Sequence, residues 1–240
     1  RRYLQKPLEG ELSEKMVFLG GPRQVGKTTL ARGLFTEARL AANSVSTDHP
    51  GETRTHYLNW DIRADRERIL AGSWDGEASL VVLDEIHKFR NWKNLVKGFY
   101  DSARGRPSFL VTGSARPDLY RKGGDSLQGR YHYYRLHPFT VAEAATLAPP
   151  RLEPMAELSF RNAPVGSLPD LLIYGGFPEP FLKQSARTLR RWQNERVERL
   201  FREDIRDTEA VRDLSTLQLL SDLIPPRVGG LLSANSLRED

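Results

Sequence analysis

The sequence predicts an α/β fold in which helices cover both faces of a parallel sheet, followed by a small helical lid domain. Short uninterrupted apolar runs of strand length alternate with longer segments of helical spacing, as buried parallel strands and their crossover helices do. After a proline-rich stretch at residues 148–169, the spacing becomes helical throughout. A chain of 240 residues, 39% of them hydrophobic, is large enough to bury such a core.

Before the proline-rich stretch, predicted strands and helices alternate along the chain. A strand is predicted over residues 16–19; it runs directly into a glycine-rich loop, after which residues 28–40 have helical spacing. Further strands are predicted at residues 57–61, 80–83, 108–112 and 131–136, and further helices at residues 62–71, 92–103 and 119–129.

The proline-rich stretch predicts a domain boundary. We expect the α/β core to span residues 1–165, the lid residues 166–228, and the start of a further domain residues 229–240. Helices are predicted in the lid at residues 170–174, 186–207 and 215–223.

Composition narrows the class of protein. The absence of cysteine excludes disulfides and thiolate metal sites. No apolar run approaches the roughly 18 residues that cross a bilayer, and the first residues lack a signal-peptide pattern, so we expect a cytoplasmic protein without a membrane partner. A formal charge of +5 favours anionic partners, although it is small enough to reflect a solvated surface.

The glycine-rich loop carries the strongest functional pattern. Its glycines let backbone N–H groups turn toward phosphate oxygens, and the following helix points its positive end at the same charge. Lys27 would place a cation at the β and γ phosphates, and the Thr28 hydroxyl would be a Mg²⁺ ligand. We therefore predict a nucleotide-binding P-loop made of Gly21, Pro22, Arg23, Gln24, Val25, Gly26, Lys27, Thr28 and Thr29.

Two carboxylates follow the strand predicted at residues 80–83. Because the carboxyl ends of parallel strands share one edge of the sheet, Asp84 and Glu85 are expected beside the P-loop. Asp84 would hold Mg²⁺ through its water shell, and Glu85 would polarise the attacking water. The alternative is that this acidic pair caps a helix.

Polar residues after the later strands extend the predicted site. Ser114 could contact the γ-phosphate or the attacking water, or it could cap the next helix. Arg130 could reach a neighbouring subunit's γ-phosphate as an arginine finger, with Arg116 and Arg121 as competing candidates. The alternative for each is a solvated arginine or an internal ion pair.

The order of these features resembles the AAA+ superfamily of ATPases, with residues 21–28 as Walker A, residues 80–85 as Walker B, Ser114 as sensor 1 and Arg130 at the finger position. The resemblance is closest to a prokaryotic branch in which an AAA+ core precedes a C-terminal domain without assigned function. The supporting segments lie at residues 21–30, 84–88, 127–130, 136–140 and 174–178. The resemblance implies ATP or ADP and Mg²⁺ as cofactors and a homo-oligomer, either a ring or a nucleotide-dependent assembly.

Two further likenesses concern the lid and the chain's last residues. Residues 176–178 resemble the Gly-x-Pro element that related ATPases place against the adenine, which makes Pro178 a candidate nucleotide contact; a helix-breaking turn is the alternative. No arginine matches sensor 2, and Arg187, Arg190 and Arg191 are unassigned candidates. Residues 232–237 resemble the opening of a helix-turn-helix-like region, so we expect a truncated or disordered C-terminal domain to begin here.

These predictions favour Mg-dependent ATP hydrolysis completed by a neighbour's arginine. The alternatives are a slow ATP/ADP switch and a DNA-handling ATPase that acts through the C-terminal domain, although nucleic-acid binding has weak support from charge alone. Residues 84–87 also spell the box of DExH helicases, but the helical tail cannot supply a second RecA-like domain. We therefore expect His87 to be a surface or hinge residue.

Overall fold

The computed structural model describes residues 2–45, 55–74, 76, 78–103, 105–113, 127–145, 167–200, 214–230 and 233–239. Contacts divide the chain into two compact units, Arg1–Leu182 and Lys183–Asp240. The predicted boundary at residues 165–166 stays a prediction, because residues 146–166 lie outside the described residues.

The first unit is built on a five-stranded parallel sheet in the order β2-β3-β4-β1-β5. The strands are β1 (Met16–Gly20), β2 (Thr55–Asn59), β3 (Leu80–Asp84), β4 (Ser108–Thr112) and β5 (Tyr131–Arg135). The prediction of a parallel sheet between helices is therefore confirmed. Since β1 lies between β4 and β5, the loop after β1 opens in the interior of the sheet rather than at its side.

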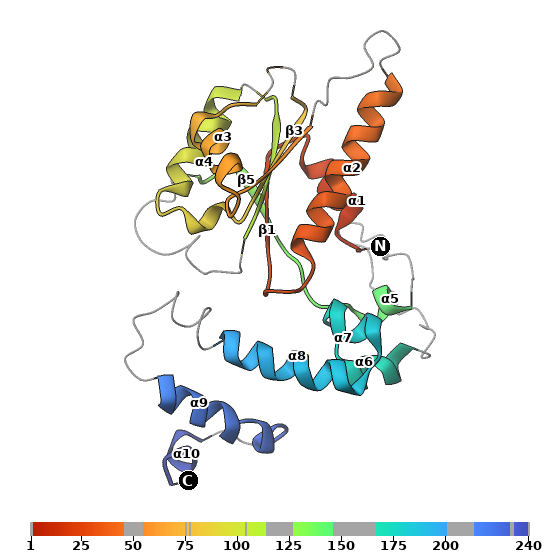
Figure 1. The fold of residues 1–240 in the computed structure, drawn as a ribbon, viewed down its shortest axis with the longest axis vertical. Coiled ribbons are helices and arrows are strands. Elements are labelled where there is room, and N and C mark those ends of the chain that lie inside the picture. Colours follow the sequence, from red (N-terminus) through yellow and green to blue (C-terminus); the bar gives the residue numbers. More distant parts are fainter. Residues whose placement is uncertain are drawn as a thin grey trace, which may run out of the picture. The chain divides into compact units, whose positions relative to one another are not determined.

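Helices cover both faces of this sheet (Figure 1). α1 (Gln5–Glu11) and α2 (Lys27–Val45) lie on one face, and α3 (Arg63–Ala71) and α4 (Trp92–Ala103) on the other. A short 3₁₀ helix, η1 (Ile86–Lys88), follows β3. This two-sided cover explains why the central strands are apolar runs instead of alternating patterns.

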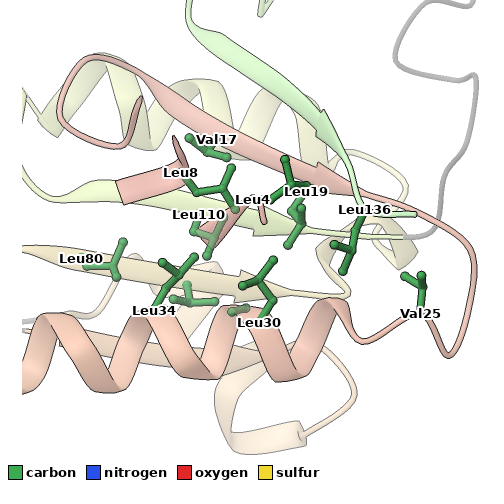
Figure 2. Close-up of a cluster of buried hydrophobic side chains, with 12 residues drawn as sticks. Leu4, Leu8, Val17, Leu19, Val25, Leu30, Leu34, Leu80, Leu110 and Leu136 are labelled. Atoms are coloured by element: carbon green, nitrogen blue, oxygen red, sulfur yellow. The ribbon is translucent and has the colours of Figure 1, made fainter. Parts of the chain in front are cut away.

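Alternate residues of each strand divide the interior into two clusters. On the α2 face, Leu80 and Leu110 join Leu30 and Leu34 of α2 (Figure 2), and Val82 belongs to the same cluster. The intervening residues face α3 and α4, where they pack with Ile69 and Val96; they include Phe18, Val81, Leu83, Phe109 and Val111. The same alternation decides which face receives the polar residues at the ends of the strands.

Several predicted boundaries shift. β2 begins two residues earlier than predicted and ends at Asn59, because the side chain of Asn59 accepts a hydrogen bond from the Asp61 N–H at 2.8 Å and turns the chain. α1 was not predicted at all, since Pro7 and Gly10 disfavour a helix; it forms because Leu4 and Leu8 bury one face of it. Most of the helix predicted at residues 119–129 lies outside the described residues.

The remaining elements are helical, as the spacing predicts. The first unit continues with α5 (Val141–Ala144), α6 (Leu168–Tyr174) and α7 (Pro178–Lys183), whose last residue belongs to the second unit. The second unit contains α8 (Ala186–Arg199), α9 (Leu214–Leu223), the 3₁₀ helix η5 (Pro225–Arg227) and α10 (Ala234–Glu239). Within the described part of the chain, no helix is both long and apolar enough to cross a membrane.

Candidate functional site

The phosphate loop, residues 21–28, leaves the carboxyl end of β1 and enters α2. Its backbone uses left-handed conformations at Gly26 (φ 96°) and at Gln24 (φ 63°), a conformation that is uncommon for a residue with a side chain. Gly21 has no room for a larger residue, since a Cβ there would lie 2.5 Å from the carbonyl oxygen of Leu136. The backbone of the loop therefore packs closely against Leu136, the residue that follows β5.

Lys27 lies inside this loop. Its side chain is folded back so that Nζ donates to the carbonyl oxygens of Gly21 and Pro22, each at 3.0 Å, and only 6% of the residue is exposed. A buried ammonium held by carbonyl oxygens can exchange them for phosphate oxygens, which are stronger acceptors. Lys27 thus lies at the place that phosphate binding requires.

Asp84 ends β3 and is completely buried. Its carboxylate accepts hydrogen bonds from three hydroxyls: Thr28 Oγ1 donates to Oδ2 at 3.0 Å, Tyr57 donates to the same oxygen, and Thr112 donates to Oδ1. Burying a carboxylate is unfavourable unless such donors satisfy it. The hydroxyls therefore fix Asp84 opposite the threonine of the phosphate loop.

Strand alternation explains why these hydroxyls meet. Asp84 continues the row of Leu80 and Val82, and Thr112 continues the row of Leu110, so both side chains lie on the α2 face. The sequence pattern indicated neither Tyr57 nor Thr112. The signal for Thr112 was present, because it is a polar residue at the end of an apolar strand; Ser114, the predicted residue, lies outside the described residues.

Glu85 differs from Asp84 in its surroundings. It has a left-handed backbone (φ 59°), and its side chain is 23% exposed. Burial raises the pKa of Glu85, an effect that the ammonium of Lys88 partly opposes. A carboxylate whose pKa is raised is a stronger base than an ordinary one, so it can accept a proton from water more readily.

A lysine and a histidine flank Glu85. Lys88 Nζ lies 3.6 Å from Glu85 Oε2 and 2.6 Å from Asp61 Oδ2, and His87 Nε2 lies 3.7 Å from Glu85 Oε2. Of the two predicted alternatives for His87, a surface or a hinge residue, the structure does not support the first: the side chain is only 13% exposed and packs against Gly113, where a Cβ would lie 2.7 Å from the His87 Nδ1. Because Gly113 has no side chain, the His87 ring can occupy the space beside it.

Residues 175–178, with the sequence Gly-Gly-Phe-Pro, reach the phosphate loop. Gly176 accepts a hydrogen bond from the Phe139 N–H at 2.6 Å, and a Cβ on Gly176 would lie 2.6 Å from the Phe139 carbonyl oxygen. Pro178 follows at the start of α7, and its Cγ lies 3.8 Å from the position of a Cβ on Gly26. The structure therefore brings Pro178 to the loop, as a nucleotide contact requires.

Arg2 is a residue of this region that the sequence pattern did not indicate. Its guanidinium donates to Glu143 Oε1 at 2.8 Å, to the Val25 carbonyl at 3.0 Å and to the His137 carbonyl, and it lies 4.7 Å from the centroid of the Phe139 ring. Glu143 is 3% exposed and is the third helical residue of a capping box that begins at Thr140. Arg2 thus fastens the phosphate loop to α5.

Arg130 lies at the opposite edge of the sheet. Its carbonyl accepts from the Met16 N–H at 3.2 Å, so it is separated from its own phosphate loop by the length of β1, about 16 Å for a five-residue strand. Its guanidinium makes two contacts to Asp101 of α4, at 2.7 and 3.3 Å, and remains 33% exposed. The structure does not bring Arg130 to the site of its own chain.

The other predicted arginines divide in two groups. Arg116 and Arg121 lie outside the described residues. The sensor 2 candidates Arg187, Arg190 and Arg191 lie on α8 in the second unit, where Arg191 Nε is 3.8 Å from Glu195 Oε1. Arg199 also pairs with Glu195, at 3.1 Å, so α8 carries ion pairs one turn apart along its exposed face.

The residues at the carboxyl edge fit a nucleotide and a magnesium ion. Thr28 and Asp84 offer hydroxyl and carboxylate oxygens 3.0 Å apart, which are the hard ligands that Mg²⁺ prefers. The N-terminus of α2 and the ammonium of Lys27 provide positive charge for phosphate. The fold and this site define a P-loop nucleotide-binding protein.

Comparison with known families makes this class more specific. The chain belongs to the AAA domain family, whose model matches residues 13–145, and residues 165–240 match a family described as a domain of unknown function. This membership and the fold support nucleotide-binding ATPase activity in general. Two uncharacterized proteins, from Mycobacterium bovis and Mycobacterium tuberculosis, are each 30% identical over 137 residues; the match covers 57% of this chain but 28% of theirs.

Solved structures with a similar fold include two proteins that are each 14% identical to this chain. AMPPCP-bound DnaA from Aquifex aeolicus gives a TM-score of 0.47, with 95% of this chain and 69% of that chain covered. ORC1 of Aeropyrum pernix in complex with DNA gives a TM-score of 0.49, with coverages of 98% and 74%.

Proposed function

We propose that this chain binds and hydrolyses Mg-ATP in the cytoplasm as one subunit of a homo-oligomeric AAA+ assembly. The observation that supports this most directly is the hydrogen bond from Thr28 Oγ1 to the buried Asp84 carboxylate, at 3.0 Å, beside the buried ammonium of Lys27. This arrangement places a hydroxyl, a carboxylate and an ammonium group beside the start of a helix, where phosphates bind.

Each residue has a distinct role in the proposal. Bound ATP supplies the phosphoryl group, and Mg²⁺ supplies positive charge that offsets the charge of its oxygens. Lys27 exchanges its carbonyl partners for phosphate oxygens, while Thr28 and, through water, Asp84 hold the cation. Glu85, whose pKa is raised by burial, orients the attacking water and takes up its proton.

The predicted contacts beyond this centre are parts of the same proposal. Pro178 would contact the nucleotide on the side of the loop where it approaches Gly26. Ser114 would sense the γ-phosphate. Arg130, which lies at the amino edge and is partly exposed, would act on the nucleotide of a neighbouring subunit after it leaves Asp101.

ATP hydrolysis by the purified protein tests the central proposal. We expect Lys27→Ala to lose ATP binding and hydrolysis, and Glu85→Gln to retain binding while losing turnover. Lys6→Ala, at an exposed lysine of α1, is the matched control and should behave as wild type. A wild type that hydrolyses no ATP at any protein concentration, or a Lys27→Ala variant as active as wild type, would exclude the proposal.

A mixing experiment tests the role of Arg130. Removal of an arginine finger lowers the rate by roughly 10³- to 10⁵-fold, so Arg130→Ala should be inactive although it binds ATP. When Arg130→Ala is mixed with Lys27→Ala, sites that combine an intact phosphate loop with an intact finger should recover part of the activity. No recovery in mixtures shown to co-assemble would mean that Arg130 does not act between subunits.

A further inference from the structure

The hydroxyl of Tyr57 reaches the carboxylate of Asp84 at the carboxyl edge of the sheet. It donates to Asp84 Oδ2, the same oxygen that accepts from Thr28 Oγ1. Thr112 donates to the other oxygen, Oδ1. A cation that takes the Thr28 hydroxyl as a ligand binds a lone pair of its oxygen, so the O–H can still donate to Asp84, and the bonds from Tyr57 and Thr112 can remain as well.

The surroundings of Tyr57 fix this hydroxyl in place. Tyr57 lies in the middle of β2, opposite Val82 of β3, and its ring packs against the core on the α2 face. The ring of Phe35 meets it edge to face at 6.2 Å between centroids, and the guanidinium carbon of Arg32 lies 5.1 Å from its centroid. Both neighbours belong to α2, so the helix that carries Thr28 also positions the ring.

The hydroxyl is a neutral donor to a buried carboxylate. It satisfies one lone pair of Asp84 Oδ2 without bringing a charge of its own, and Thr112 does the same at Oδ1. Together these two bonds fix the orientation of the Asp84 carboxylate.

We propose that Tyr57 is a positioning residue for the divalent cation: through its hydrogen bond to Oδ2 it holds the Asp84 carboxylate in the orientation that binds Mg²⁺ at Thr28. This inference rests on the proposed function, because it assumes that Thr28 and Asp84 hold the metal. Tyr57 itself touches neither metal nor nucleotide. Residues that orient a metal ligand in this way change metal affinity by roughly 10- to 100-fold when they are lost.

Tyr57→Phe isolates the hydroxyl, because the ring and its packing remain. We would measure binding of Mn²⁺, as a paramagnetic substitute for Mg²⁺, to the protein saturated with ADP by electron paramagnetic resonance. We expect Mn²⁺ affinity to fall about 10-fold. Binding of ADP in EDTA, where no metal is present, should stay within about twofold of wild type, because the hydroxyl acts only through Asp84.

The Mg²⁺ dependence of ATP hydrolysis is a second measurement of the same effect. The Mg²⁺ concentration for half-maximal turnover should rise about 10-fold in Tyr57→Phe, and excess Mg²⁺ should restore the maximal rate. A merely structural contribution would instead lower the maximal rate or the affinity for metal-free ADP at every Mg²⁺ concentration.

Tyr134→Phe provides the matched control. Tyr134 packs against the same core cluster, and its pKa is raised by burial and by a hydrogen bond to the carboxylate of Glu11. The control therefore removes a tyrosine hydroxyl that donates to Glu11 instead of Asp84. It should leave the Mn²⁺ affinity and the Mg²⁺ concentration for half-maximal turnover unchanged.

The outcomes separate this inference from the proposed function. A wild type that binds Mn²⁺ with ADP, together with a Tyr57→Phe variant of equal metal affinity, would overturn the role of Tyr57 alone. An equal loss in Tyr134→Phe would also overturn it, because the effect would then belong to the core. A wild type that binds neither ADP nor metal would overturn both.

Discussion

The two sides of the phosphate loop are held by different chemistry. On one side, the buried carboxylate of Asp84 accepts from the hydroxyls of Thr28, Tyr57 and Thr112. On the other, the guanidinium of Arg2 meets the carboxylate of Glu143 at 2.8 Å and also donates to the Val25 carbonyl at 3.0 Å. Neutral donors fix the first carboxylate, whereas an opposite charge neutralises the second.

This difference indicates that the two sides of the loop have different functions. A carboxylate that neutral hydroxyls hold keeps its full charge, so it can attract a cation to the loop. In a buried ion pair the two charges neutralise each other, so the pair does not attract a further ion. Removing one partner of such a pair strongly destabilises the fold. We therefore expect the Asp84 side to serve catalysis and the Arg2 side to serve stability.

Asp84→Asn should have the largest effect, on the Asp84 side. The amide keeps the shape of the side chain but loses the charge that we propose to hold Mg²⁺, so we expect the hydrolysis rate to fall at least about 10³-fold, equivalent to about 4 kcal/mol. The free energy of unfolding should change by less than about 1 kcal/mol, since hydroxyls can accept as well as donate. Steady-state turnover and urea unfolding measure the two quantities. A large loss of stability would contradict this difference in function.

Arg2→Ala should have the next largest effect, on the Arg2 side. It leaves Glu143 buried without its cation, and such a loss destabilises a protein by about 3 kcal/mol, the lower end of the known range because Arg2 is 11% exposed. Urea unfolding measures this change. Arg63→Ala, which breaks an exposed pair with Glu67 on α3, is the control and should leave the unfolding midpoint unchanged.

A double variant sharpens this prediction. Arg2→Met combined with Glu143→Gln removes both charges but leaves an amide oxygen to accept from the Tyr3 or Thr140 N–H, so it should recover most of the stability that Arg2→Ala loses. If the double variant is as unstable as Arg2→Ala, the loss comes from packing or from the Val25 carbonyl, and the ion pair is not the main stabilising contact.

Thr140→Ala should have the smallest effect. The Thr140 side chain accepts from the Glu143 N–H at 3.2 Å and caps α5, and the loss of such a cap destabilises by about 1 kcal/mol. Because Glu143 also belongs to the pair with Arg2, the effects of Thr140→Ala and Arg2→Ala should not add. Additive unfolding free energies in the double variant would show that α5 and the Arg2 pair are independent.

Each residue of the site that the sequence predicts stands in a recognisable local pattern. Lys27 and Thr28 follow a strand and a glycine-rich loop, and Asp84 follows another apolar strand, so local spacing alone predicts their roles. Tyr57, by contrast, lies 27 residues from Asp84, and Arg2 lies 141 residues from Glu143. A hydrogen bond over such a separation leaves no periodic signal, and in this chain only the fold reveals it.

The left-handed conformation of Glu85 is another feature that spacing does not predict. A residue with a side chain rarely adopts this conformation, and it does so where surrounding contacts determine it. Lys88 and the packing of η1 after β3 supply such contacts. The prediction placed Glu85 at the correct edge of the sheet, while its raised pKa follows from burial that only the folded chain produces.

The sequence by itself determined the alternation of strands and helices, the parallel sheet and the phosphate loop, because each depends on the type and spacing of neighbouring residues. The tertiary structure decided the strand order β2-β3-β4-β1-β5, which places Tyr57, Asp84 and Thr112 beside Thr28. Strand order depends on packing between distant segments, which the period of a single strand does not encode.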